Sequence, residues 1–145
     1  VDFSSKESVQ SFKEKLNDII SVQGIDICVN NAGINNIKPF EEYTEEEYDL
    51  MMDVNLKSAF TVSQLVAPAM KKRGSGKIVN ISSIKTDLTR KVLGKVGMKS
   101  AEKAVPMKRL GHPYEIARLV AFLCSPSNTY ITGQNITIDG GVSCG

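Results

Sequence analysis

The chain has 145 residues, of which 41% are apolar and 23% are charged, so its composition is that of a globular protein rather than a disordered one. Its net charge of +2 is too small to indicate a nucleic-acid or membrane partner. No apolar run approaches the roughly 20 residues of a membrane span, and the first residues are neither basic nor apolar enough for a signal peptide. The length suits one domain, which we expect to cover residues 1–145.

The three cysteines, Cys28, Cys124 and Cys144, lie far apart in the sequence. An odd and scattered set indicates reduced thiols and a cytoplasmic protein, rather than a disulfide framework or a zinc site. Cys28 falls within an apolar run, so we interpret it as buried filling and not as a reactive thiol.

The first predicted helix runs from Ser4 to Ile20. Ser4 is the expected N-cap, with Glu7 three residues later as its partner in a capping box. Gly24 is expected to end the helix. One apolar stripe follows helical spacing, formed by Val9, Phe12, Leu16, Ile19 and Ile20.

Two short apolar runs predict buried parallel strands. Residues 25–30 form the first and are followed by an Asn-Asn-Ala-Gly turn at 30–33, where glycine permits close approach of a ligand. Residues 77–81 form the second, which ends in two serines. If these strands pair, Asn30 and Ser83 become neighbours at the carboxyl edge of the sheet, where ligands bind in open α/β folds.

A long helix is predicted between the two strands. Thr44 and Glu47 form a capping box at its start, and the helix extends to about Lys72, where Gly74 closes it. Asn55 lies among apolar positions of this helix, so we expect its side chain to point into packed surroundings.

The last part of the chain predicts two more helices and a strand. Residues 86–104 are basic and weakly helical, which suits either a phosphate-facing surface or a solvated helix face. A helix over 114–124 and a strand over 135–139 follow. Strands that alternate with helices predict an α/β fold with a parallel sheet.

A set of motifs in this order resembles the short-chain dehydrogenase/reductase family. The subgroup that it resembles contains 3-oxoacyl carrier-protein reductases, gluconate and glucose dehydrogenases, and enzymes similar to tropinone reductase. The residues that carry the resemblance are Asn30-Asn31-Ala32-Gly33, Asn55, Ser82-Ser83, Ile84-Lys85-Thr86, Arg109-Leu110-Gly111-His112-Pro113, Tyr130-Ile131-Thr132-Gly133 and Asp139-Gly140-Gly141.

The resemblance implies a partial Rossmann-like, doubly wound parallel sheet. In the family's strand order, residues 25–30, 77–81 and 135–139 would be the fourth, fifth and seventh strands. We expect the first βαβ unit, the helix that carries Tyr-x-x-x-Lys and strand six to be missing. The remaining strands are then expected to form a small sheet in which 135–139 pairs with 77–81.

The resemblance also implies roles for individual residues. Ser83 would hydrogen-bond the substrate carbonyl, and Asn55 would hold a water in a proton relay. The implied contacts to NAD or NADP come from Asp2, Asn30, Ala32, Gly33 and Thr86, with Asp2 at the adenine and Thr86 at the nicotinamide. As alternatives, Asn55 can be a polar residue at a helix kink, and Ser83 a turn residue that ends a strand. No metal site is expected.

The sequence departs from the family pattern in two places. No tyrosine is followed four residues later by lysine, and no G-x-x-x-G-x-G motif occurs. Ile84 serves both as the end of the family's Ser-Ser-x segment and as the middle of its Pro-Gly-x-Ile-x-Thr segment, so the intervening helix and strand look excised there. A βαβ crossover takes roughly 30 or more residues, and none are available.

By family, the chain is therefore expected to descend from an NAD(P)-dependent oxidoreductase that acts on small carbonyl or alcohol substrates as a homo-oligomer. We expect this chain to be inactive because the acid/base tyrosine is absent. Two alternatives remain open: a non-catalytic chain that associates with intact subunits, and an incomplete gene-model or splice product. Choice of substrate, and of NAD over NADP, is not encoded in the residues present.

Overall fold

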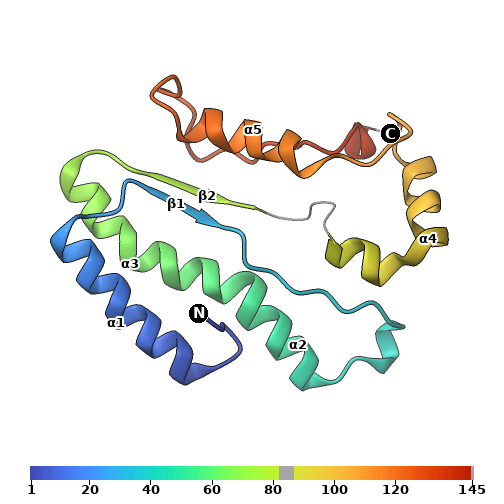
Figure 1. Ribbon diagram of the computed structural model, residues 1–145, viewed down its shortest axis with the longest axis horizontal. Coiled ribbons are helices and arrows are strands. Elements are labelled where there is room, and N and C mark those ends of the chain that lie inside the picture. Colours follow the sequence, from blue (N-terminus) through green and yellow to red (C-terminus); the bar gives the residue numbers. More distant parts are fainter. Residues whose placement is uncertain (82–86, 145) are drawn as a thin grey trace. The chain divides into compact units, whose positions relative to one another are not determined.

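A short parallel sheet forms one layer of the N-terminal part of the chain, with two helices against one of its faces (Figure 1). The computed structural model describes residues 1–81 and 87–144. Strand β1 (Ile27–Asn30) pairs in parallel with β2 (Lys77–Asn80), with Ile27 opposite Lys77 and Asn30 opposite Asn80. The predicted α/β fold with a parallel sheet is confirmed, and both strands begin and end within two residues of the predicted bounds.

The N-cap of helix α1 (Lys6–Val22) lies one residue later than predicted. Ser5, not Ser4, is the N-cap, and its hydroxyl accepts a hydrogen bond from the backbone N–H of Ser8. The helix ends as expected before Gly24, which takes a φ of 74° in the left-handed region that glycine favours.

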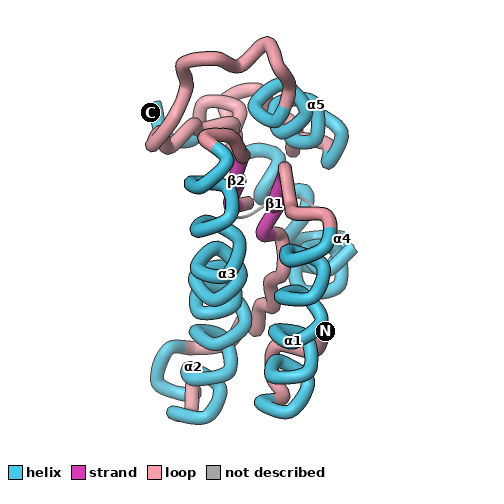
Figure 2. Tube along the Cα trace, turned by 90° about the vertical axis from the view of Figure 1, so that its left-hand side faces the viewer, coloured by secondary structure: helices cyan, strands magenta, loops and turns pink. Residues whose placement is uncertain are grey.

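The predicted long helix over 44–72 forms as one continuous helical stretch (Figure 2). Its winding changes within the stretch. Thr44 and Glu47 make the predicted capping box at the start of α2 (Glu45–Met52). A π-helical turn, η2 (Asp53–Lys57), follows and leads into α3 (Ser58–Arg73). Gly74 closes α3 with a φ of 68°. The apolar pattern of the sequence carried no sign of the π turn.

The core of this part lies between α1, α3 and one face of the sheet. Its buried members are Leu16, Cys28, Val66 and Met70. Burial raises the pKa of the Cys28 thiol, which agrees with its interpretation as buried filling.

The chain divides into two compact units, residues 1–81 and 82–145. The second unit contains α4 (Asp87–Ala104), which breaks from helical geometry at Gly94, and α5 (Pro113–Cys124), followed by the short turn η3 (Val142–Cys144). The α5 bounds lie within one residue of the predicted helix. No described helix is long and apolar enough to cross a membrane. A single domain over residues 1–145 stays a prediction.

The predicted strand over 135–139 was wrong. Among the described residues the sheet has two strands, and this segment belongs to neither. Ile136 and Ile138 are 40% and 46% exposed instead of packed in a sheet. A strand needs a neighbouring strand for its backbone hydrogen bonds. In the family's order that neighbour would be strand six, which we expect the chain to lack.

Candidate functional site

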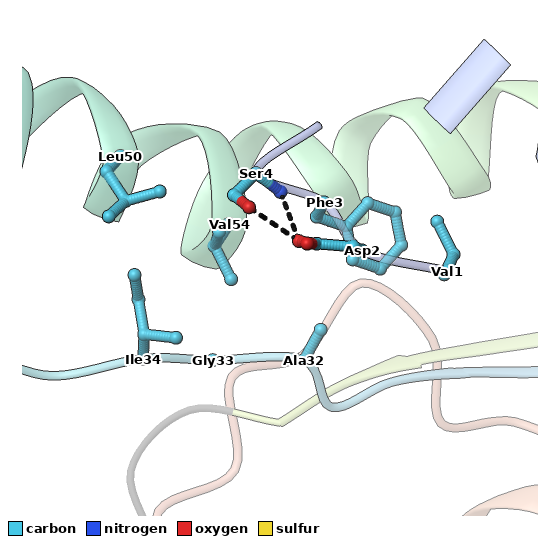
Figure 3. A pocket seen from close by; sticks show the side chains of 9 residues that line it. All are labelled: Val1, Asp2, Phe3, Ser4, Ala32, Gly33, Ile34, Leu50 and Val54. Atoms are coloured by element: carbon cyan, nitrogen blue, oxygen red, sulfur yellow. Dashed lines mark hydrogen bonds between the residues drawn. The ribbon is translucent and has the colours of Figure 1, made fainter. Parts of the chain in front are cut away.

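An open pocket of about 470 Å³ lies in the N-terminal unit, where three segments that are distant in the sequence meet (Figure 3). The segment 1–4 forms one side and the segment 32–34, directly after β1, forms another. Leu50 of α2 and Val54 of the π turn complete the lining. The pocket therefore opens at the carboxyl end of a parallel strand, where the connecting loop leaves the sheet.

Asp2 supplies the carboxylate among the residues that line this pocket. The backbone N–H and the hydroxyl of Ser4 both donate to Asp2 Oδ1, at 2.9 and 2.6 Å (Figure 3). These bonds, with that from the Ser4 hydroxyl first, lower the pKa of Asp2. Asp2 is therefore ionised at neutral pH, and Ser4 fixes its orientation.

Asn55 holds the 32–34 side of the pocket through its side chain. Its Oδ1 accepts from the backbone N–H of Ile34 at 2.8 Å, and its Nδ2 donates to the Ile34 carbonyl at 2.9 Å. The residue is exposed, so the expected packed surroundings were wrong. Asn55 lies in the π turn, which agrees with the alternative of a polar residue at a helix irregularity.

Asn30 does not line the pocket and instead joins three elements at its edge. Its Nδ2 donates to Ser63 Oγ of α3 at 3.0 Å and to Asn80 Oδ1 of β2 at 2.8 Å. The backbone of Ile81 also donates to the Asn30 carbonyl at 2.9 Å. The side chain thus steadies the sheet at the point where the pocket segment begins.

The loop that leads from the pocket to α2 is anchored by one carboxylate. Glu47 forms an ion pair with Lys38 and accepts from the side chain of Asn36 at 3.1 Å. It also accepts from the backbone N–H of Thr44 at 3.0 Å, as the capping box requires. These contacts lower the pKa of Glu47, with the bond from Lys38 first. The loop is thereby tied to the start of the helix that lines the pocket.

The structure brings together some of the predicted site residues and leaves others undetermined. Asp2, Ala32 and Gly33 line one pocket, and Asn55 lies beside it. Ser83 and Thr86 lie outside the described residues. The sequence analysis missed Ser4 and Ser63, since neither motif nor spacing marks a serine that bonds to a predicted site residue.

The chemistry of the pocket suits an organic ligand with one donor group. The walls are mostly apolar, formed by Phe3, Ala32, Ile34, Leu50 and Val54. Asp2 adds a single carboxylate, which accepts hydrogen bonds from amino or hydroxyl groups. Among the described residues, no group of metal-ligating side chains is arranged to hold an ion. The site therefore suits a largely apolar group that carries a hydrogen-bond donor.

Two family models match the sequence. Residues 1–95 match the model described as short chain dehydrogenase, and residues 82–143 match the model described as enoyl-(acyl carrier protein) reductase. A tropinone reductase homolog of Arabidopsis thaliana is 34% identical over 187 residues, covering 98% of this chain and 69% of the relative. The 3-oxoacyl-(acyl-carrier-protein) reductase of Thermotoga maritima is 33% identical, covering 90% of this chain and 71% of the relative.

The length of the first alignment bears on the expected internal deletion. It covers 187 residues although the chain has 145, so the relative contains internal residues that have no counterpart here. This agrees with an internal deletion, while its position at Ile84 stays a prediction.

Solved structures share the fold. A gluconate 5-dehydrogenase from Burkholderia cenocepacia, in complex with NADP and tartrate, has a TM-score of 0.85 at 23% identity and covers 100% of this chain and 74% of its own. A 7α-hydroxysteroid dehydrogenase, complexed with NADH and 7-oxo glycochenodeoxycholic acid, has a TM-score of 0.81 at 27% identity and covers 97% of this chain and 71% of its own. At its identity the first shows the fold alone.

Proposed function

The chain belongs to the short-chain dehydrogenase family, and from this premise we propose that it keeps the adenosine-binding part of an NAD(P)-dependent carbonyl/alcohol oxidoreductase without its acid/base. The observation that supports the first half is the pocket in which Asp2, Ala32 and Gly33 meet. Their segments lie about thirty residues apart, and the family resemblance assigns all three to the cofactor.

The pocket residues fit the adenine end of such a cofactor. Apolar walls would cover the faces of a purine ring, and the ionised Asp2 would accept from its exocyclic amino group. When bound, the nicotinamide of NAD(P) supplies the hydride in this family's chemistry. What this chain itself contributes is binding and orientation of the nucleotide.

The second half of the proposal rests on the absent tyrosine–lysine pair. Tyr114 alone has a cation four residues later, and that cation is Arg118. The guanidinium of Arg118 lies 5.2 Å from the centre of the Tyr114 ring, and both residues belong to α5. In the sequence, α4 separates Tyr114 from the serine pair at 82–83, so Tyr114 is not on the helix that carries the family's tyrosine. We assign it no acid/base role.

Cofactor affinity is expected to be weak, because a Gly-rich turn to seat the pyrophosphate does not occur in this sequence. We expect a dissociation constant of about 1 mM for NADH and NADPH, which corresponds to only about 4 kcal/mol of binding free energy. Isothermal titration calorimetry on the full chain measures this value, with Asp2→Ala as the matched variant that removes the carboxylate. Micromolar binding by the wild-type chain would contradict the prediction.

As a second candidate, we propose that the chain associates with an intact subunit of its family. Three exposed apolar side chains support this candidate, because they recur at intervals of four residues along the central helical stretch. Met52 is 38%, Leu56 60% and Phe60 63% exposed. Single exposed apolar side chains are ordinary, but three that adjoin along one helix face form a patch of the kind that a partner covers. The substrate class and the homo-oligomer of the family remain proposals for this chain.

The association has a direct test. Co-expression of the tagged chain with the intact Arabidopsis homolog is expected to give a complex that survives gel filtration. The double variant Leu56→Glu with Phe60→Glu should abolish the complex, since two charges cannot be buried unpaired at an apolar contact. A substitution on α1, Val22→Glu, is the control because Val22 is 86% exposed on another helix. A complex unaffected by the double variant would rule out this surface.

We also propose a cytoplasmic location. Cys28 and Cys124 are free in the structure, which supports a chain kept in a reducing compartment.

A further inference from the structure

The segment 30–34, which forms one wall of the pocket, is held at both ends by side chains from a single helical stretch. At its far end, Asn55 makes two hydrogen bonds to the backbone of Ile34. At its near end, Ser63 Oγ accepts from the Asn30 side chain at 3.0 Å. Ala32 and Gly33, the pocket residues, lie between these two anchors.

The π turn turns the two anchors toward the same side of the helical stretch. Ser63 lies eight positions after Asn55, and at about 100° per residue a regular α-helix would place them about 80° apart around its axis. A π turn takes more residues per turn than the α-helix, and the later part of the turn lies between Asn55 and Ser63, so the angle between them falls below that value. Asn55 lies in that turn and Ser63 in α3, which follows it directly.

The near anchor also fixes Asn30 to the sheet. Both hydrogens of its side-chain amide are used, one by Ser63 and the other by Asn80 of β2 at 2.8 Å. Its carbonyl accepts from the backbone of Ile81. Loss of the Ser63 hydroxyl would leave a half-buried amide hydrogen without its acceptor and free the side chain to turn.

We propose that Ser63 is a positioning residue of the pocket: by holding Asn30, it fixes the start of the segment whose other end Asn55 holds, and so keeps Ala32 and Gly33 in place for the ligand. This inference rests on the proposed function, in which the pocket binds the adenosine part of NAD(P). Ser63 acts through Asn30 and does not touch the pocket.

The test compares three variants of the full chain by titration with ADP-ribose. Ser63→Ala removes the hydroxyl and is expected to weaken binding about 2- to 10-fold, the effect of one net hydrogen bond. Ser63→Thr keeps a hydroxyl and is expected to restore the affinity. Ser21→Ala is the matched control, because the Ser21 hydroxyl donates only to the Asp18 carbonyl of α1 among the bonds of the described residues.

A second measurement separates this inference from the proposed function. In nitrogen-15-labelled protein, the side-chain amide of Asn30 is expected to exchange its hydrogens faster in Ser63→Ala than in wild type and Ser63→Thr, and the Ile81 amide likewise. If the wild-type chain binds no ADP-ribose, the proposed function fails, and unchanged exchange in Ser63→Ala would then overturn the anchor as well. If ADP-ribose binds with equal affinity to wild type and Ser63→Ala, the positioning role is overturned.

Discussion

The purified chain is expected to leave the rate of NADH or NADPH oxidation unchanged with any carbonyl substrate. A positioned acid that protonates the forming alkoxide contributes about 10²–10⁴-fold to such a reaction. No tyrosine of this sequence has lysine four residues later, so the group that supplies this factor in the family is absent. The absorbance of the reduced nicotinamide, followed with and without protein, measures the rate.

Two variants sharpen this experiment. Ser83→Ala removes the hydroxyl that the resemblance assigns to the substrate carbonyl and is expected to behave like wild type, since neither turns over. A chimaera that carries the Tyr-x-x-x-Lys segment of the Arabidopsis homolog between Ile84 and Lys85 is also expected to stay inactive, because the Gly-rich turn that seats the pyrophosphate is still absent from it. Protein-dependent oxidation by the wild-type chain that disappears in Ser83→Ala would contradict the account.

Gly76→Ala is expected to destabilise the N-terminal unit by about 1–3 kcal/mol, the usual cost of overpacking a filled core. A Cβ at Gly76 would lie 2.6 Å from Met70 Cβ and closer still to Met70 Cγ. Met70 is a buried member of the core, and its Cβ moves only with the backbone of α3.

Urea unfolding followed by circular dichroism measures the change, as a lower midpoint with an unchanged slope. The matched control is Gly33→Ala in the same unit, because a Cβ there meets Asn55 Oδ1 only at 3.6 Å, an ordinary contact distance. A Gly76→Ala midpoint equal to that of Gly33→Ala would mean that Met70 does not occupy the core position described.

Local signals in the sequence predicted most of the individual elements. The capping box of Thr44 and Glu47 gave the start of α2, and the apolar runs gave β1 and β2. Both signals depend on residues close together in the chain, so they are readable without the fold. The N-cap of α1 was misplaced by one residue because Ser4 and Ser5 are equally good caps, and the Ser4 hydroxyl is already bound to Asp2.

Features that depend on distant contacts were not predictable from local pattern. The π turn places Asn55 opposite the Ile34 backbone, a contact between residues 21 positions apart. The segment 135–139 has the composition of a strand, but a strand also requires a partner strand. Neither of the described strands, β1 and β2, pairs with it. The resemblance identified Asp2, Ala32 and Gly33, whereas their meeting in one pocket with Leu50 and Val54 emerges only from the fold.

The pocket is tested most directly by titrating nitrogen-15-labelled chain with ADP-ribose and following its backbone amide signals. The account predicts saturable shifts in the amides of residues 2–4 and 32–34, which line the pocket, with signals of α5 unchanged. The same shifts should be reduced in Asp2→Ala. No shift in residues 2–4 and 32–34 at millimolar ADP-ribose, or shifts confined to α5, would contradict the claim that this chain keeps the adenosine-binding part of its family.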